Sequence, residues 1–196
     1  MSNFDPKKYA GTWYELARIP NAFQSDVWWI PRDTISSIQR ITQEPEIQGY
    51  SVINEMCYKW NLPCCKFLFG EKNVMLGDAW FDGKSSFKMI FHGLLGSMAL
   101  ILHMLFAANK RIIAPETPNY HIKKIIENKR GEYEYVLVTG GQVGEENLAW
   151  IMTKRHPDTM QEKHFNVVKD LLAYADELGY DTSSMKLHSL LEKRDV

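Results

Sequence analysis

The sequence predicts an all-β domain of eight antiparallel strands, either a barrel or a sandwich, followed by one α-helix. In the first two-thirds of the chain, short apolar runs rich in β-branched and aromatic residues alternate with turn signals, which is typical of antiparallel sheets. In the last third, apolar residues recur every three or four positions, which indicates an amphipathic helix. A chain of 196 residues, 45% hydrophobic and 24% charged, suits one domain over residues 1–196.

The predicted strands follow one another through short turns. Asp82-Gly83-Lys84 marks a hairpin between the fourth and fifth strands, and residues 128–131 (Asn-Lys-Arg-Gly) mark a turn between the sixth and seventh. Glycines within residues 140–144 interrupt the chain before the last strand. The eight strands are expected at residues 12–18, 33–41, 49–57, 74–81, 86–91, 120–127, 133–139 and 148–153.

One helix is expected at about residues 158–178. Asp158 and Gln161 have the spacing of a capping pair at its start, and Gly179 stands where a helix-terminating glycine belongs. The apolar positions that would pack on a wall of the sheet are Met160, His164, Val167, Val168, Leu171, Ala175 and Leu178.

Charge and cysteine usage exclude several function classes. The formal net charge of −1 gives no field that would attract nucleic acid, so no such partner is expected. The N-terminus carries no apolar leader, so a cytoplasmic location is expected. Cys57, Cys64 and Cys65 form neither an even disulfide framework nor, without nearby histidines, a metal site. We expect no metal and no cofactor.

No motif for catalysis stands out. The six histidines lie in no recognisable nucleophile arrangement, and no glycine-rich phosphate loop or zinc-protease motif occurs. The sequence therefore favours a binding protein over an enzyme.

Three segments are unusually apolar: residues 27–30 (Val-Trp-Trp-Ile), 60–69 and 94–108. The last lies within a run, residues 89–109, that contains no Asp, Glu, Lys or Arg. As a helix, 94–108 would reach roughly 22 Å at about 1.5 Å per residue, against a hydrocarbon core about 30 Å thick. A transmembrane span is therefore not expected, and the flanking strands would have to lie on opposite sides of the bilayer.

The sequence resembles the lipocalin family. Gly11-Thr12-Trp13-Tyr14, preceded by residues 4–9 (Phe-Asp-Pro-Lys-Lys-Tyr), is similar to the family's opening motif. Residues 4–24 are most similar to the group of bacterial lipocalin, apolipoprotein D and the plant temperature-induced lipocalins. Further segments match in the family's order: residues 51–54, 77–79, 135–138, 148–154 and 179–181. The resemblance covers nearly the whole chain.

The resemblance implies an up-and-down barrel at about residues 11–154, with a long apolar insertion at about 93–118 that has room for a helix. It implies a barrel floor built from Gly11 and Trp13, with a cation on Trp13. The family carries Arg there, whereas this chain has Lys154 followed by Arg155, and the sequence leaves open which of the two reaches Trp13.

The resemblance also implies storage or transport of a small hydrophobic ligand inside the barrel, such as a fatty acid or a lysophospholipid. A lipocalin-fold enzyme acting on a lipid or isoprenoid is the alternative, and the plant relatives add a link to the stress response. The residues expected to point inward are Asn54, Phe87, Met89, Phe91, Tyr120 and Trp150. These side chains would otherwise simply fill the interior. A buried Asn is costly unless it is hydrogen-bonded, so Asn54 favours a polar contact.

In lipocalin topology, the three apolar segments would all lie at the ligand entrance. We expect them to dock on a membrane surface, which makes the protein peripherally membrane-associated. The alternatives are a lid formed by the segments themselves and a homodimer contact. The side chains expected to face the membrane are Trp28, Trp29, Phe67, Phe69, Leu100, Leu102, Leu105 and Phe106.

Overall fold

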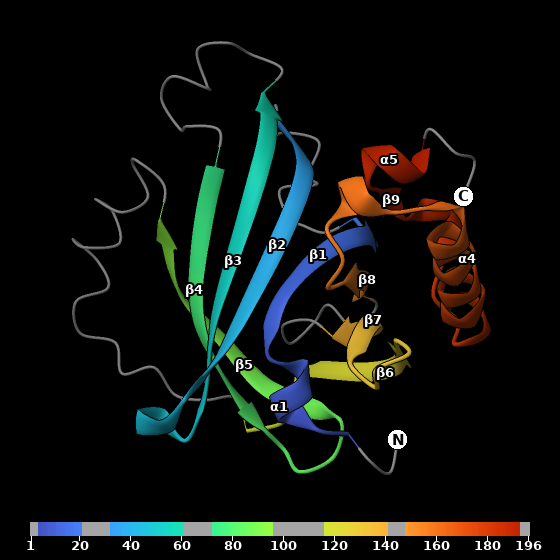
Figure 1. The fold of residues 1–196 in the computed structure, drawn as a ribbon. Coiled ribbons are helices and arrows are strands. Elements are labelled where there is room, and N and C mark those ends of the chain that lie inside the picture. The colour runs from blue at the N-terminus through green and yellow to red at the C-terminus, as the bar shows by residue number, and fades with distance from the viewer. Residues whose placement is uncertain (1–3, 21–31, 61–71, 96–115, 141–147, 193–196) are drawn as a thin grey trace.

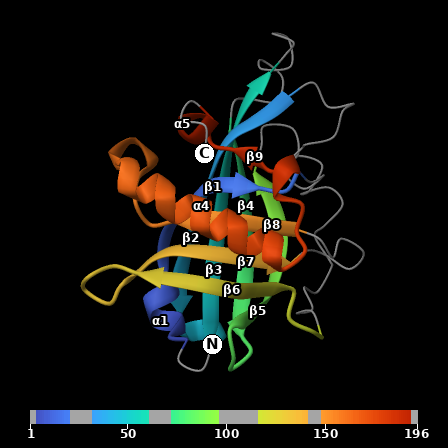
Figure 2. The same cartoon turned by 90° about the vertical axis from the view of Figure 1, so that its right-hand side faces the viewer.

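Eight antiparallel strands close into a barrel, and one long helix packs on its outside (Figures 1 and 2). The structure is a computed structural model that describes residues 4–20, 32–60, 72–95, 116–140 and 148–192. Its strands are β1 (Gly11–Arg18), β2 (Arg32–Glu44), β3 (Gly49–Trp60), β4 (Lys72–Phe81), β5 (Ser86–Leu95), β6 (Tyr120–Glu127), β7 (Tyr133–Gly140), β8 (Leu148–Thr153) and β9 (Lys186–Leu187). Its helices are α1 (Pro6–Tyr9), η2 (Pro45–Ile47), η3 (Pro157–Thr159), α4 (Glu162–Glu177), η4 (Thr182–Ser184) and α5 (Ser189–Glu192).

The strand order confirms the up-and-down barrel. Each strand from β2 to β8 pairs with its neighbours in sequence, and β1 pairs with both β8 and β2, which closes the sheet. Strands β2, β3 and β5 are longer than predicted. Because β5 continues to Leu95, the long apolar insertion begins later than the predicted residue 93.

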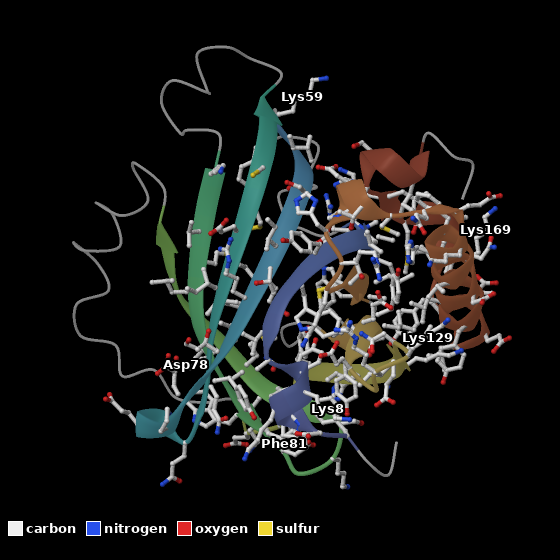
Figure 3. The ribbon with its side chains drawn as sticks, in the orientation of Figure 1. Lys8, Lys59, Asp78, Phe81, Lys129 and Lys169 are labelled. Atoms are coloured by element: carbon white, nitrogen blue, oxygen red, sulfur yellow. The ribbon has the colours of Figure 1, made fainter. Side chains whose placement is uncertain are left out.

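The connections divide the barrel into two ends. Helix α1 and the short turns β2–β3, β4–β5 and β6–β7 lie at one end, called here the α1 end (Figure 1). Connections that follow β1, β3, β5 and β7 leave from the opposite end, called here the loop end. Most of their residues (21–31, 61–71, 96–115 and 141–147) lie outside the described residues. Figure 3 shows Lys8 and Phe81 at the α1 end and Lys59 toward the loop end.

Helix α4 packs on the outer face of β1, β7 and β8. Its buried side chains include Val168, Leu171 and Ala175, as predicted, and also Phe165, which the periodicity did not include. The predicted Leu178 is instead exposed. These side chains form an outer apolar cluster with Leu16, Ala17, Leu137, Ala149 and Ile151 of the barrel.

The start of α4 differs from the prediction, whereas its end agrees with it. Asp158 belongs to η3, and the helix begins after Gln161, whose backbone N–H donates to Nδ1 of His164 at 2.7 Å. Gly179 has φ +88°, and the N–H groups of Gly179 and Tyr180 bond back to the carbonyls of Asp176 and Ala175. These two backbone hydrogen bonds form the Schellman motif, which requires a residue in the left-handed conformation and so favours glycine.

The chain after α4 adds an edge to the sheet that was not predicted. Strand β9 pairs with the end of β1, at Ala17 and Arg18. Met185 and Leu191 are buried in the outer cluster beside α4. The tail therefore covers apolar surface that α4 leaves uncovered.

Strands β5 and β6 share few backbone contacts. Only Ser86–His121 and Phe87–Tyr120 pair among the described residues. Beyond them, the Asn119 side chain takes the place of a ladder residue: its Oδ1 accepts from the backbone N–H of Met89 and its Nδ2 donates to the Met89 carbonyl, both at 2.8 Å. An asparagine amide carries the donor and acceptor that a backbone peptide would supply.

No helix among the described residues is long and apolar enough to cross a membrane.

Candidate functional site

The floor of the barrel lies at the α1 end and is made of aromatic rings. Trp13 is fully buried and donates from Nε1 to the Tyr9 carbonyl at 2.8 Å. Phe87 packs within 6 Å of several rings, including Tyr9 at a centroid distance of 5.7 Å. The other rings that contact Phe87 are Phe4, Tyr50, Phe81 and Tyr120.

Lys154, not Arg155, is the cation that contacts Trp13. Its Nζ lies 5.1 Å from the ring centroid and donates to the carbonyls of Lys8 and Ala10, at 2.7 and 2.6 Å. Burial lowers the pKa of Lys154. Gly11 has φ +127°, and a Cβ there would lie 3.3 Å from Nζ, so glycine allows the close approach. Arg155 instead pairs with Glu134, through Nε at 2.9 Å and through Nη2.

The predicted ligand residues all face the interior, but they lie at different heights. Phe87 and Tyr120 belong to the floor. Tyr9 donates to the Tyr120 hydroxyl at 2.7 Å, because Tyr120 donates its own proton to Oε1 of Gln39 at 2.9 Å. Burial raises the pKa of both tyrosines, so both hydroxyls stay protonated at neutral pH.

Asn54, Met89, Phe91 and Trp150 line the interior beyond the floor. Asn54 and Met89 are buried, whereas Phe91 and Trp150 are partly exposed. Asn54 is only 7% exposed, and its Oδ1 has no hydrogen-bond partner. Unsatisfied buried polar atoms are uncommon and call for an explanation.

A β-bulge in β1 turns Arg18 to the inner face of the barrel, where Glu15 already points. Opposite β8, Glu15 pairs with Met152 and Arg18 with Trp150, whereas Ala17 pairs with Ile151. Met152 and Trp150 pack inside the barrel, in the same cluster as Trp13 and Phe87, whereas Ile151 belongs to the outer apolar cluster. Cross-strand partners share a face of the sheet. Glu15 and Arg18 therefore both point inward, while Leu16 and Ala17 pack outward.

Glu15 and Arg18 form a buried ion pair. Arg18 Nη1 lies 2.5 Å from Glu15 Oε1. The Arg18 side chain is 4% exposed and the Glu15 side chain 7%. Arg18 Nη2 also donates to the Thr34 carbonyl at 3.3 Å. Both residues were missed as site candidates from the sequence.

Strand β2 has a matching bulge at Ile35. Thr34 pairs with Tyr58 and Ser37 with Met56, both of which are buried inside the barrel, while Ile35 is 52% exposed. Farther along, Gln39 pairs with Trp13 on one side and Asn54 on the other. The inward polar residues of β1–β3 thus form one polar strip: Glu15, Arg18, Thr34, Ser37, Gln39 and Asn54, all buried.

The opposite wall of the barrel is apolar. Its inward residues from β5 to β8 include Met89, Phe91, Ile122, Val138, Trp150 and Met152. Thr139 and Thr153 are buried polar residues of β7 and β8, but their partners Ala149 and Tyr135 belong to the outer cluster. Among the described residues, the buried polar side chains of the interior, apart from the Tyr9, Tyr120 and Tyr133 hydroxyls, come from β1–β3.

Several predicted features lie outside the described residues. These are Cys64, Cys65 and the eight side chains expected to face a membrane, Trp28, Trp29, Phe67, Phe69, Leu100, Leu102, Leu105 and Phe106. Cys57 is described and half-buried on β3. Over the described ranges, no three His, Cys, Asp or Glu side chains gather as metal ligands would.

An open groove of about 750 Å³ lies outside the barrel at the α1 end. Its walls include Lys7, Arg130, Glu132 and His156. A groove with such charged walls does not suit an apolar ligand, because burying charge against hydrocarbon is unfavourable.

No protein-family model and no curated protein matches this sequence. Solved structures do match. One is the siderocalin Ex-FABP, described as functioning through dual ligand specificities; the TM-score is 0.44 and the identity 12%, over 92% of this chain and 93% of that chain. The eight-stranded closed barrel with its C-terminal helix is itself lipocalin-like, and such a barrel has room for packed side chains or one small ligand.

Proposed function

We propose that the chain is a lipocalin of the group that includes bacterial lipocalin, apolipoprotein D and the plant temperature-induced lipocalins, and that it binds a small hydrophobic ligand without converting it. The observation that carries the proposal is the inner wall of Met89, Phe91 and Trp150, of which Phe91 and Trp150 stay partly exposed beyond the packed floor. Large apolar side chains that are left partly exposed inside a barrel favour an apolar guest.

The test compares one inward and one outward residue of the same strand. Phe91 points inward on β5, and its neighbour Ile90 points outward. Phe91→Gln is expected to weaken binding of a lipid probe such as N-phenyl-1-naphthylamine at least tenfold, because it places an amide against the ligand. Ile90→Gln is the matched control and is expected to bind like wild type. Equal binding by both variants would contradict the proposed site.

Binding and turnover are separated by the fate of the lipid. Native mass spectrometry of the purified protein identifies co-purifying lipids, and incubation with those lipids is expected to return them unchanged. A product with an altered mass would favour the alternative, a lipocalin-fold enzyme acting on a lipid or isoprenoid.

We further propose that the loop end docks on a membrane surface, which would make the protein peripheral to a membrane on the cytoplasmic side. Support comes from the sequence of three apolar segments and from topology, since β1, β3 and β5 all end there. In vesicle flotation with phosphatidylcholine and phosphatidylglycerol, the wild type is expected to float. A variant with residues 96–108 replaced by a Gly/Ser turn should stay in solution. The replacement spares Leu94 and Leu95, which pair with β4.

If neither protein floats, the docking proposal is wrong. Size-exclusion chromatography then separates the two remaining explanations. A dimer that the 96–108 variant loses would indicate a subunit contact, and a monomer in both would indicate an internal lid.

A further inference from the structure

We infer that the ligand of this barrel is a neutral amphipathic molecule that carries a hydroxyl group, not a free fatty acid, and that the hydroxyl binds at Asn54. The inference rests on the proposed function and narrows its ligand class. Three observations carry it: the one-sided polar strip, the buried Glu15–Arg18 ion pair, and the unpaired Asn54 oxygen.

The position of the polar strip sets the orientation of a guest. Glu15, Arg18, Gln39 and Asn54 come from β1–β3, whereas β5–β8 contribute apolar side chains such as Met89. A uniformly apolar molecule would leave the Asn54 Oδ1 without a hydrogen-bond partner, and burying an unpaired polar atom is unfavourable. A molecule with one polar end satisfies both walls, with that end against β1–β3.

The charge of the interior selects against an anionic end. Glu15 and Arg18 are the only charged side chains among the buried residues that the structure describes, and they pair at 2.5 Å. A carboxylate in this space would lie beside the Glu15 carboxylate or have to displace it from Arg18. Either outcome brings a second negative charge next to a buried one, and like charges at a buried site repel. A neutral polar end avoids this repulsion.

The Asn54 side chain selects a hydrogen-bond donor. Its Oδ1 is an acceptor with no partner, in a side chain only 7% exposed. An ester or ether oxygen cannot donate to it, whereas a hydroxyl can. A hydroxyl also accepts, so it would satisfy Asn54 in either orientation of the amide group. Gln39, the cross-strand neighbour of Asn54, already accepts from Tyr120.

The test uses three probes with the same twelve-carbon chain and different polar ends: dodecanol, methyl laurate and laurate. Each displaces N-phenyl-1-naphthylamine from the full chain at pH 7.5, where laurate is ionised. Dodecanol is expected to bind at least tenfold more tightly than laurate. Methyl laurate, which is neutral but has no donor, is expected to lie between them, since a lost hydrogen bond to a buried acceptor is worth roughly 5- to 100-fold.

Two substitutions test the two selecting features separately. Asn54→Leu removes the acceptor, so dodecanol should fall to the affinity of methyl laurate, which should change little. Glu15→Gln removes the carboxylate that pairs with Arg18 and that would repel laurate, so laurate should bind at least tenfold more tightly than it binds wild type. The matched control is Glu55→Gln, which breaks the outward-facing Arg40–Glu55 pair and makes the same change in net charge. It should leave the laurate affinity unchanged.

A second variant covers the case in which Glu15→Gln does not fold. Glu15→Gln combined with Arg18→Met restores a neutral interior, and laurate should then stay as weak as in wild type. Laurate binding as tight as dodecanol in wild type would overturn the inference and leave the hydrophobic-ligand proposal standing. No displacement by any probe, with the fold intact by circular dichroism, would overturn both.

Discussion

Replacing Lys154 by Met should destabilise the barrel far more than the same replacement of its neighbour Arg155. Lys154 Nζ closes the α1 end through two hydrogen bonds to the carbonyls of Lys8 and Ala10 and a contact with the Trp13 ring. Hydrogen bonds from a charged donor contribute about 1.5–3 kcal/mol each, and a partly exposed cation–π contact about 0.5–1 kcal/mol. The freed carbonyls lie near the surface and regain water, so we expect a net loss of about 2–4 kcal/mol.

Arg155→Met provides the matched comparison because it removes the same charge one residue away. Arg155 pairs with Glu134 in a half-exposed position, where ion pairs contribute little, so its loss should be about 1 kcal/mol. Urea unfolding followed by far-ultraviolet circular dichroism measures both values. In a domain of this size, a loss of 3 kcal/mol lowers the melting temperature by roughly 6–12 °C. Equal losses, or a larger loss for Arg155→Met, would refute the assignment of Lys154 to Trp13.

Three further predictions concern other parts of the fold. Asn119→Ala should lower the free energy of unfolding in urea by about 2 kcal/mol or more, because it leaves the Met89 N–H and carbonyl without their partners. A loss below about 0.5 kcal/mol would show that water replaces these hydrogen bonds. Burial and the charges of Arg155 and Lys163 lower the folded-state pKa of His164, so its contribution to stability is present above the unfolded pKa near 6.5 and is lost as the pH falls below it. His164→Gln keeps an acceptor for the Gln161 N–H and should make the stability loss between pH 7.5 and 5.5 shallower. An unchanged dependence of stability on pH would contradict this role. Arg18→Met alone should cost about 3–5 kcal/mol because it removes the guanidinium that pairs with the buried Glu15 carboxylate, whereas Glu15→Leu with Arg18→Met should be neutral or stabilising. A double variant as unstable as the single one would mean that the pair itself supports the fold.

Periodicity and turn residues were sufficient to locate the strands, because both signals are local, whereas the closed up-and-down order was predicted from the resemblance to lipocalins. The hairpin at Asp82-Gly83-Lys84 and the helix end at Gly179 both appear where turn chemistry predicts them. Strand ends were less predictable. Strands β2, β3 and β5 extend beyond the predicted ends through pairing with their neighbours, which the sequence of one strand does not show.

Strict alternation explains why the ion pair was missed. Along residues 15–18 (Glu-Leu-Ala-Arg), a regular strand would place Glu15 and Ala17 on one face and Leu16 and Arg18 on the other. The bulge breaks this rule, so that Glu15 and Arg18 share the inner face. A signal was nevertheless present: two charged residues flank two apolar ones in a strand whose Trp13 had to be buried. Asn119 was missed for a related reason, since it mimics a strand residue with its side chain.

The two ends of this barrel differ in how their buried polar groups are arranged. At the α1 end, the aromatic floor, the Lys154 contacts and the hydrogen-bonded Tyr9–Tyr120–Gln39 chain form the arrangement of a stable core. Toward the loop end, two bulges turn Arg18 and Thr34 inward beside Glu15 and Ser37, although apolar residues of similar volume would stabilise a barrel at least as well. β-Bulges are frequent where a side chain must be re-aimed for function. A polar strip that stability does not require, next to an unpaired Asn54, is therefore best explained by a guest that hydrogen-bonds to it.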